Sequence, residues 1–328
     1  MKKITNQVMI LMVILSNIMF FSTNSFIWMW VTMEVMTMSI IPIYVINNNL
    51  KNSEEILKFF IIQSLSSNLI LFLTTIMKEN ISTLMFKSII LLMIVTKMGV
   101  APIHMWVIKL FKNLKWMKIF IFLTVQKVMP MMMIMIFLKY KALIFIVIMN
   151  SIFSTLGMNF LSTRMIMMFS SFSHTSWMFM SMIFSMKLFK MYFLIYSLVT
   201  MSMCKIMSNN KMNFLFQMFT IKKKNNNEKM NMNLSITKLL IILMGLLPMI
   251  GFMPKFMIMF YSMHKYFVIF FLMIMTNILT LMFYTQFSMN LFLNSKIMMK
   301  TMTKKNNLKE KMSGILNSLI LLFMIQKM

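Results

Sequence analysis

Four ionisable residues lie well inside long apolar runs of the sequence: Glu34, Lys97, Lys127 and Lys255. A charge at the centre of a bilayer costs about 2.5–3.5 kcal/mol on insertion scales, so it usually pairs or faces internal water. Burial disfavours an ammonium and a nearby carboxylate favours it, so movement of the carboxylate can load or release a proton. The four residues therefore point to proton handling, with Glu34 as a partner for one lysine. The alternative is that a lysine near a span end lifts its ammonium to the lipid headgroups.

Helix-breaking residues accompany two of these lysines. Gly99 and Pro102 follow Lys97, and Gly251 and Pro254 precede Lys255. A break in a membrane helix frees backbone groups that must face protein or a wet cavity. Paired interrupted helices mark the ion sites of many transporters, which favours a functional role here. A simple proline kink is the alternative.

Two histidines extend the set of candidate proton carriers. His104 follows the first break, and His174 lies in a serine-rich segment of another apolar run. Histidine changes its charge near neutral pH and can relay protons. Either residue could instead be a packed histidine bonded to a neighbouring serine.

The composition requires that these residues be positioned by membrane helices. Of 328 residues, 60% are hydrophobic and 12% are charged, whereas soluble domains are about 45–50% apolar and about 25% charged. This excludes a soluble enzyme, a collagen-like chain, a disordered tail and a secreted disulfide scaffold. Cys204 is the single cysteine, so no internal disulfide can form.

The apolar runs predict an all-α polytopic membrane protein with about eleven spans, since each crossing needs about 20 residues. We expect one membrane domain over 1–328, with a polar loop at 209–235 on the same side of the membrane as the N-terminus. The predicted spans are 4–21, 26–46, 56–77, 83–108, 117–138, 142–160, 166–186, 190–208, 236–264, 266–290 and 313–326.

The net charge of +27 comes mostly from lysines that lie between the apolar runs. This placement favours water and lipid headgroups as partners and predicts no nucleic acid. The loops that share a side with the N-terminus hold most basic residues, which places that terminus inside and the C-terminus outside. The 52 methionines indicate an organellar gene from an A/T-rich genome. Methionine as a flexible filler of the core is the alternative.

Several motifs are absent from the sequence. It holds no Walker loop or GxGxxG sequence for a nucleotide. It also holds no cysteine cluster or spaced histidine pair for an iron–sulfur centre, haem or other metal. We therefore expect the chain to bind no cofactor.

Six segments resemble the antiporter-like membrane subunits of respiratory complex I, and those containing Lys97 and Lys255 are the most specific. The segments are Trp30–Glu34, Ser53–Ser64, Lys97–Trp106, Gln126–Pro130, Ser170–Trp177 and Gly251–Lys255. The resemblance implies an antiporter-like fold with two discontinuous helices, in the mitochondrial inner membrane. The N-terminus would then face the matrix and the C-terminus the intermembrane space.

The same resemblance assigns roles to the buried residues. It implies that Glu34 modulates Lys97, that Lys127 is the central relay, and that Lys255 belongs to the second discontinuous helix. Proton translocation would be coupled to quinone reduction in other subunits, so this chain would carry no redox centre. The implied partners are other complex I membrane-arm subunits, both antiporter-like and small, and phospholipids such as cardiolipin. A stand-alone cation/proton antiporter and a purely structural scaffold remain as alternatives.

Overall fold

The computed structural model describes residues 2–46, 53–77, 83–136, 140–160, 162–210, 212, 226–246, 249–263 and 266–300. Regular structure in these residues is almost entirely helical. The elements are α1 (Lys2–Ser22), α2 (Phe26–Val45), α3 (Ser53–Met77), α4 (Thr83–Met98), α5 (Met105–Asn113), α6 (Trp116–Leu123), α7 (Val125–Ile136), α8 (Tyr140–Thr155), the 3-10 turn η2 (Leu156–Asn159), α9 (Thr163–Phe184), α10 (Met186–Asn209), α12 (Asn226–Met244), α13 (Phe252–Ser262) and α14 (Phe267–Lys300).

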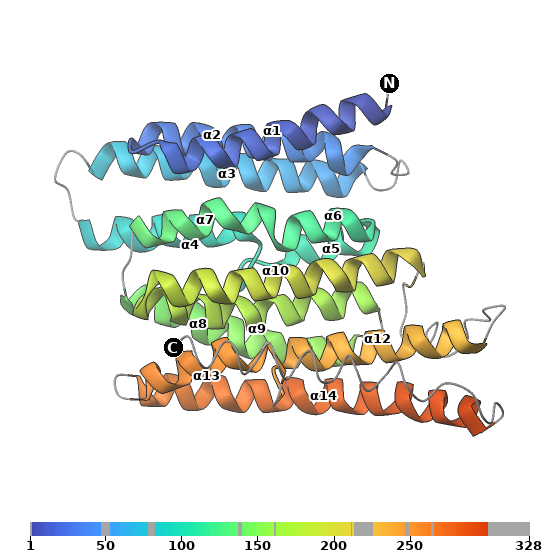
Figure 1. Cartoon of the computed structure of the whole chain (residues 1–328). Coiled ribbons are helices and arrows are strands. Elements are labelled where there is room, and N and C mark those ends of the chain that lie inside the picture. Colours follow the sequence, from blue (N-terminus) through green and yellow to red (C-terminus); the bar gives the residue numbers. More distant parts are fainter. Residues whose placement is uncertain are drawn as a thin grey trace. The chain divides into compact units, whose positions relative to one another are not determined.

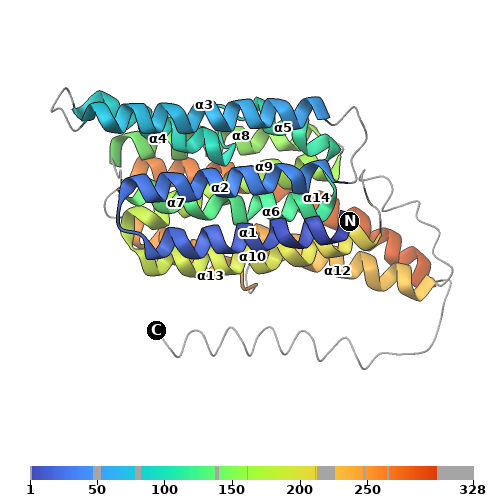
Figure 2. The same cartoon turned by 90° about the horizontal axis from the view of Figure 1, so that it is seen from above.

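The helices form two compact units, Met1–Asn150 and Ser151–Met328, with the boundary inside α8. In the first unit, α1 packs on α2, α2 on α3 and α3 on α4, and α7 packs against both α4 and α2. Both views show α3 and α4 as neighbouring helices (Figures 1 and 2). This packing brings the helices that carry Glu34, Lys97 and Lys127 into one bundle. The single membrane domain inferred from the sequence stays a prediction.

The second unit is built around α9 and α10. These two helices pack on each other, α13 packs against both, and α12 packs on α10 and runs beside α14 (Figure 1). The helix α13 also contacts α14. The residues Lys255 and His174 therefore lie on neighbouring helices of this unit.

Six helices of the described residues are long and apolar enough to cross a membrane: Ile4–Ser22, Phe26–Val45, Ser53–Ile76, Trp116–Ile136, Met186–Asn209 and Phe267–Gln286. Helices also occupy the other predicted spans up to residue 290, but breaks shorten several of them and serines make α9 more polar. The span 313–326 lies outside the described residues. A polytopic all-α protein is confirmed, and the total of eleven spans stays a prediction.

The predicted polar loop 209–235 is partly helical in the structure. The helix α12 begins at Asn226, and only its second half, Leu234–Met244, is apolar. Polar residues at the start of a membrane helix can remain helical because the backbone hydrogen bonds form within the segment itself.

The first predicted break coincides with a gap between α4 and α5. Gly99 follows the end of α4 with φ +65°, and Pro102 forms a cis peptide bond with Ala101. A Cβ atom at Gly99 would run into the Val107 side chain. Glycine therefore fits this position through both its backbone conformation and its small size.

The second break separates α12 from α13, and its glycines have different roles. Gly245 has φ +73° directly after α12, whereas Gly251 is the N-cap of α13 with φ −66°. A Cβ atom at Gly251 would run into the Ile242 carbonyl oxygen, so space alone requires glycine there. Pro254 lies in the first turn of α13, where proline is tolerated. That either helix pair crosses a membrane as one discontinuous span stays a prediction.

Candidate functional site

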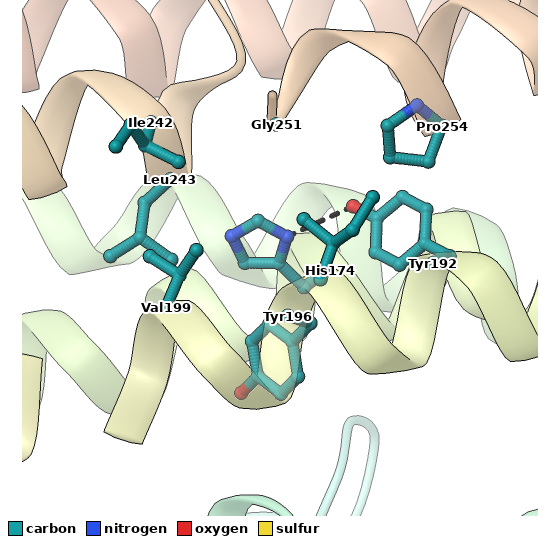
Figure 3. Close-up of a pocket in the computed structure, with 9 residues that line it drawn as sticks. His174, Tyr192, Tyr196, Val199, Ile242, Leu243, Gly251 and Pro254 are labelled. Carbon is teal, nitrogen blue, oxygen red and sulfur yellow. Dashed lines mark hydrogen bonds between the residues drawn. The ribbon is translucent and has the colours of Figure 1, made fainter. Parts of the chain in front are cut away.

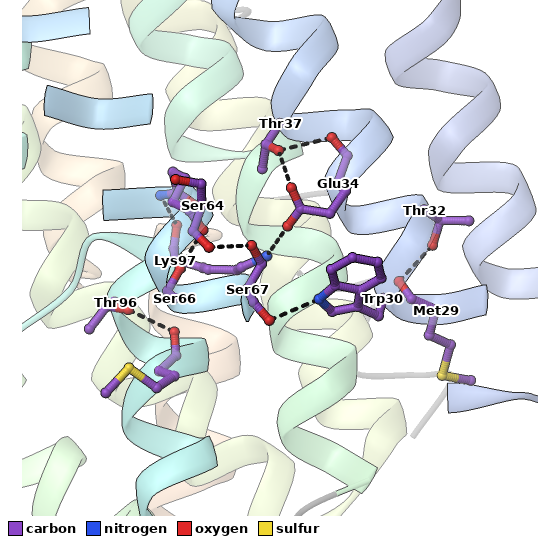
Figure 4. Close-up of polar contacts among 12 residues, drawn as sticks. Met29, Trp30, Thr32, Glu34, Thr37, Ser64, Ser66, Ser67, Thr96 and Lys97 are labelled. Atoms are coloured by element: carbon purple, nitrogen blue, oxygen red, sulfur yellow. Dashed lines mark hydrogen bonds and ion pairs between the residues drawn. The ribbon is translucent and has the colours of Figure 1, made fainter. Parts of the chain in front are cut away.

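An ion pair between Glu34 on α2 and Lys97 on α4 is the centre of the first unit. The Lys97 ammonium lies 3.1 Å from a Glu34 carboxylate oxygen, and the two side chains are 2% and 19% exposed. The Thr37 hydroxyl donates to the Glu34 backbone carbonyl at 2.9 Å and lies 3.5 Å from the other carboxylate oxygen (Figure 4). The structure thus pairs Glu34 with Lys97, the lysine that the family resemblance implied as its partner.

Neighbouring backbone and amide groups fix both partners of this pair. The Gln63 amide on α3 donates to the Lys97 backbone carbonyl at 3.0 Å. On the other side, the Trp30 indole N–H donates to the Ser67 carbonyl at 2.9 Å, which links α2 to α3 (Figure 4). Lys97 also lies in the last turn of α4, where the negative end of the helix dipole favours a cation. The pair is therefore held from three helices.

Lys127 lies in the first turn of α7 and is 1% exposed. The helices α4 and α2 pack against α7, so Lys127 is on a helix that neighbours both members of the ion pair. The adjacent Gln126 is also buried, and its side-chain oxygen accepts a hydrogen bond of 3.2 Å from the Tyr44 hydroxyl on α2. The helix α2 thus contacts Lys97 through Glu34, and it contacts Gln126, the neighbour of Lys127, through Tyr44.

Lys118 lies at the very start of the predicted span 117–138 and was grouped with the basic residues of the preceding loop, but the structure buries it. Its ammonium donates to the backbone carbonyls of Tyr44 at 2.8 Å and Ile46 at 2.6 Å. These carbonyls lie at the C-terminal end of α2, where helical hydrogen-bond partners are missing and a cation is favourable. No sequence pattern separates Lys118 from Lys109, Lys112 and Lys115, since the contact depends on the fold.

Replacing Lys118 with methionine is expected to destabilise the first unit by about 1–3 kcal/mol, because two buried carbonyls lose their donor. The measurement is thermal inactivation of the assembled protein in detergent. Lys118→Arg should keep most of the stability, and Lys115→Met is the matched control because Lys115 is exposed. Equal melting of the two methionine variants would contradict the assigned role of Lys118.

Lys255 is anchored by neutral groups in the second unit. Its ammonium donates to the Met244 backbone carbonyl at 2.9 Å and to the Asn277 side-chain oxygen at 3.0 Å. Met244 ends α12 and Asn277 belongs to α14, so the lysine on α13 joins three helices. Asn277 was missed in the sequence analysis, although a lone asparagine in an apolar run is a detectable signal.

His174 faces a cavity between α9, α10, α12 and α13. Its Nδ1 lies 2.9 Å from the Tyr192 hydroxyl, and its ring centroid is 5.0 Å from that of Tyr196 (Figure 3). The cavity has a volume of about 20 Å³, and Gly251 and Pro254 line it from α13. This is space for a water molecule beside the break that precedes Lys255.

His104 lies in the first break and is buried. Its Nδ1 is 3.0 Å from the Pro102 carbonyl oxygen, and it is the N-cap residue of α5. The structure therefore places His104 beside the break that follows Lys97.

These arrangements suit proton exchange among lysine, carboxylate, histidine and water. Within the described residues, no cluster of three or more His, Cys, Asp or Glu side chains could hold a metal ion. The structure joins Glu34 with Lys97 directly, and it places His174 in a cavity that borders the Lys255 helix.

The fold is that of the antiporter-like membrane subunits of respiratory and Mrp-type complexes. A chain of respiratory complex I from Thermus thermophilus superposes with a TM-score of 0.77 at 16% identity, covering 87% of this chain and 70% of that one. A chain of the Mrp complex from Dietzia gives a TM-score of 0.73 at 13% identity, covering 85% and 59%. At such low identity the likeness concerns the fold.

Curated relatives specify the family. This chain is 32% identical to NADH-ubiquinone oxidoreductase chain 2 of Anopheles gambiae, over 96% of this chain and 94% of the relative. The corresponding protein of Aedes aegypti is 31% identical, over 93% of each chain. No protein-family model matches the sequence. The chain belongs to the NADH-ubiquinone oxidoreductase chain 2 family.

Proposed function

We propose that this chain is a membrane-arm subunit of respiratory complex I that translocates protons across the mitochondrial inner membrane. The observation that carries the proposal is the buried Glu34–Lys97 ion pair, in a chain of this family and fold. Lys127 and Lys255 add two more buried lysines. Buried amines of this kind can bind and release protons without any metal or redox group.

The ion pair offers a means of coupling. While Glu34 stays within 3.1 Å, it favours the charged form of Lys97. A movement that separates them leaves the ammonium in an apolar environment, which favours release of its proton. Since moving one charge against 100 mV takes about 2.3 kcal/mol, the separation must be driven from outside this chain. We assign that energy to quinone reduction in other subunits and expect no cofactor in this one.

Lys127, Lys255 and the two histidines are proposed as further carriers. Lys127 would receive the proton in the first unit, and Lys255 would hold one in the second. His174 and the water-sized space beside it would serve transfer within the second unit, since a histidine and a phenol 2.9 Å apart can exchange a proton. His104 would be a proton carrier beside the first break, where its Nδ1 faces the Pro102 carbonyl oxygen.

Association with a redox assembly separates this proposal from a stand-alone antiporter. The similarity to a chain of an Mrp complex keeps the antiporter as the second candidate. Native mass spectrometry of the chain solubilised from inner membranes, with an NADH–quinone reductase assay on the same particle, decides between them. We expect the chain in a large active complex together with other membrane-arm subunits and bound cardiolipin. If the chain is found only in particles that lack reductase activity, the stand-alone antiporter is favoured.

The proposed orientation places the N-terminus in the matrix and the C-terminus in the intermembrane space. It rests on the excess of basic residues in the loops on the N-terminal side. We expect an epitope at the N-terminus to resist external protease in mitoplasts and an epitope at the C-terminus to be removed. Immunoblotting of both tagged chains tests this, and the reverse pattern would invert the topology.

A further inference from the structure

The helix α14 carries a polar side chain in one of the most apolar parts of the protein. Asn277 lies inside the apolar segment Phe267–Gln286, within the part of the chain that the structure describes. An amide in an apolar environment is costly unless it is hydrogen-bonded. Its oxygen accepts from the Lys255 ammonium at 3.0 Å, so the two helices α13 and α14 meet through this contact.

Lys97 and Lys255 have partners of different chemistry. The Lys97 ammonium faces a carboxylate, whereas the contacts of the Lys255 ammonium are the Asn277 amide and the Met244 carbonyl. The helices α9, α10, α13 and α14 contain no acidic residue in their described sequences. The helix α12 contains one, Glu228, which lies near the opposite end of that helix from Met244. The Lys255 ammonium is thus held by dipoles rather than by a counter-charge from these helices.

A side-chain amide can serve both protonation states of an amine. Its oxygen accepts from an ammonium, and after a half-turn of the amide its nitrogen can donate to the lone pair of a neutral amine. A carboxylate would stabilise only the charged form. We propose, on the basis of the function proposed above, that Asn277 is a positioning residue that holds Lys255 at the α12–α13 break in both protonation states.

The geometry of the break supports this role. Met244 ends α12, and its carbonyl has no helical partner, so it accepts from Lys255 at 2.9 Å. The Met244 carbonyl and the Asn277 amide together fix the nitrogen between α12 and α14. Three titratable groups on the helices packed against α13 line the cavity with Gly251 and Pro254: His174 on α9, and Tyr192 and Tyr196 on α10. Other titratable groups on these helices include Arg164 on α9, Lys187, Lys190, Cys204 and Lys205 on α10, and Tyr284 on α14. The His174 imidazole is the base among the cavity groups, so it can accept a proton that leaves Lys255 while the amine stays in place.

The test compares Asn277→Asp, Asn277→Leu and Asn277→Gln in the assembled complex reconstituted in liposomes. Asn277→Asp should slow pumping about tenfold or more near pH 7, because a fixed carboxylate holds the ammonium, and the rate should recover as the pH rises. Asn277→Leu should slow pumping at every pH without such recovery. Asn277→Gln should restore most of the rate, since the amide is kept. Thr276→Val is the control on α14, because the Thr276 hydroxyl bonds only its own helix at the Met273 carbonyl.

The outcomes separate this inference from the proposed function. Rates are expressed per assembled complex, so reduced assembly with wild-type pumping and pH profile in the Asp and Leu variants overturns the positioning role. If Asn277→Asp does not assemble, the pumping rates of Asn277→Leu and Asn277→Gln per assembled complex decide. Wild-type pumping in Asn277→Leu then overturns the positioning role. Lys255→Met is measured in parallel. Normal pumping in Lys255→Met contradicts the role of this lysine, whereas a defect there with unaffected Asn277 variants overturns only the inference.

Discussion

Replacing Glu34 with glutamine is expected to lower the proton-pumping rate of the assembled complex at least tenfold. Glutamine keeps the shape and one acceptor oxygen of glutamate but removes the charge that faces Lys97 at 3.1 Å. In Glu34→Gln the buried Lys97 ammonium loses its counter-charge, which favours a neutral amine that no longer exchanges a proton. Loss of an acid–base group typically slows a reaction by about 10²–10⁴-fold. Because Glu34 is 19% exposed, we expect an effect at or below the lower end of that range. The measurement is the initial rate of lumen acidification in proteoliposomes.

The matched control is Glu55→Gln. Glu55 also faces a lysine, Lys58, at 3.5 Å, but the Lys58 side chain is 51% exposed. Surface pairs contribute about 0–1 kcal/mol, so this variant should pump at nearly the wild-type rate. Equal rates in Glu34→Gln and wild type would show that the buried pair does not control proton loading at Lys97.

Replacing Gly251 with alanine is expected to destabilise the second unit by about 3 kcal/mol. The added Cβ would meet the Ile242 carbonyl oxygen, which is backbone and cannot move aside as a flexible side chain can. Overpacking typically costs about 1–3 kcal/mol, and a backbone obstacle belongs at the upper end. The expected result is a several-fold loss of assembled complex at the growth temperature, with earlier thermal inactivation of the remainder.

Phe256→Ala is the control for this substitution, because Phe256 is exposed on the same helix, α13. It changes far more atoms than Gly251→Ala does, but the Phe256 ring is 47% exposed and stacks on Phe252, so its loss creates no overlap with the backbone. Phe256→Ala should therefore lower assembly much less than Gly251→Ala. If Gly251→Ala assembled as well as Phe256→Ala, the close approach of α12 and α13 at Gly251 would be wrong.

The sequence was sufficient to identify the two members of the ion pair in the first unit. Glu34 and Lys97 stand out because charges are costly in apolar runs, and they form an ion pair in the structure. Gly99 was correctly associated with a break, because its positive φ is a local property of the backbone. Residues that carry a local physical cost could therefore be identified without any tertiary information.

Other contacts could not be predicted, because they depend on which helices become neighbours. The helices are apolar on most sides, so hydrophobic periodicity does not reveal which face meets which partner. Lys118 was indistinguishable from loop lysines until the end of α2 was placed beside it. Asn277 lies 22 residues from Lys255, and their contact exists only because α13 and α14 pack together.

The most direct test of the central claim is proton pumping per assembled complex in Lys127→Met. Methionine has a volume close to that of lysine and fits an apolar site, so the first unit should fold and the complex should assemble in normal amounts. We predict that NADH oxidation then drives pumping at least about tenfold more slowly than in wild type, since a relay amine has been lost. Reduced assembly with normal pumping per assembled complex would contradict the account and would make Lys127 a structural residue.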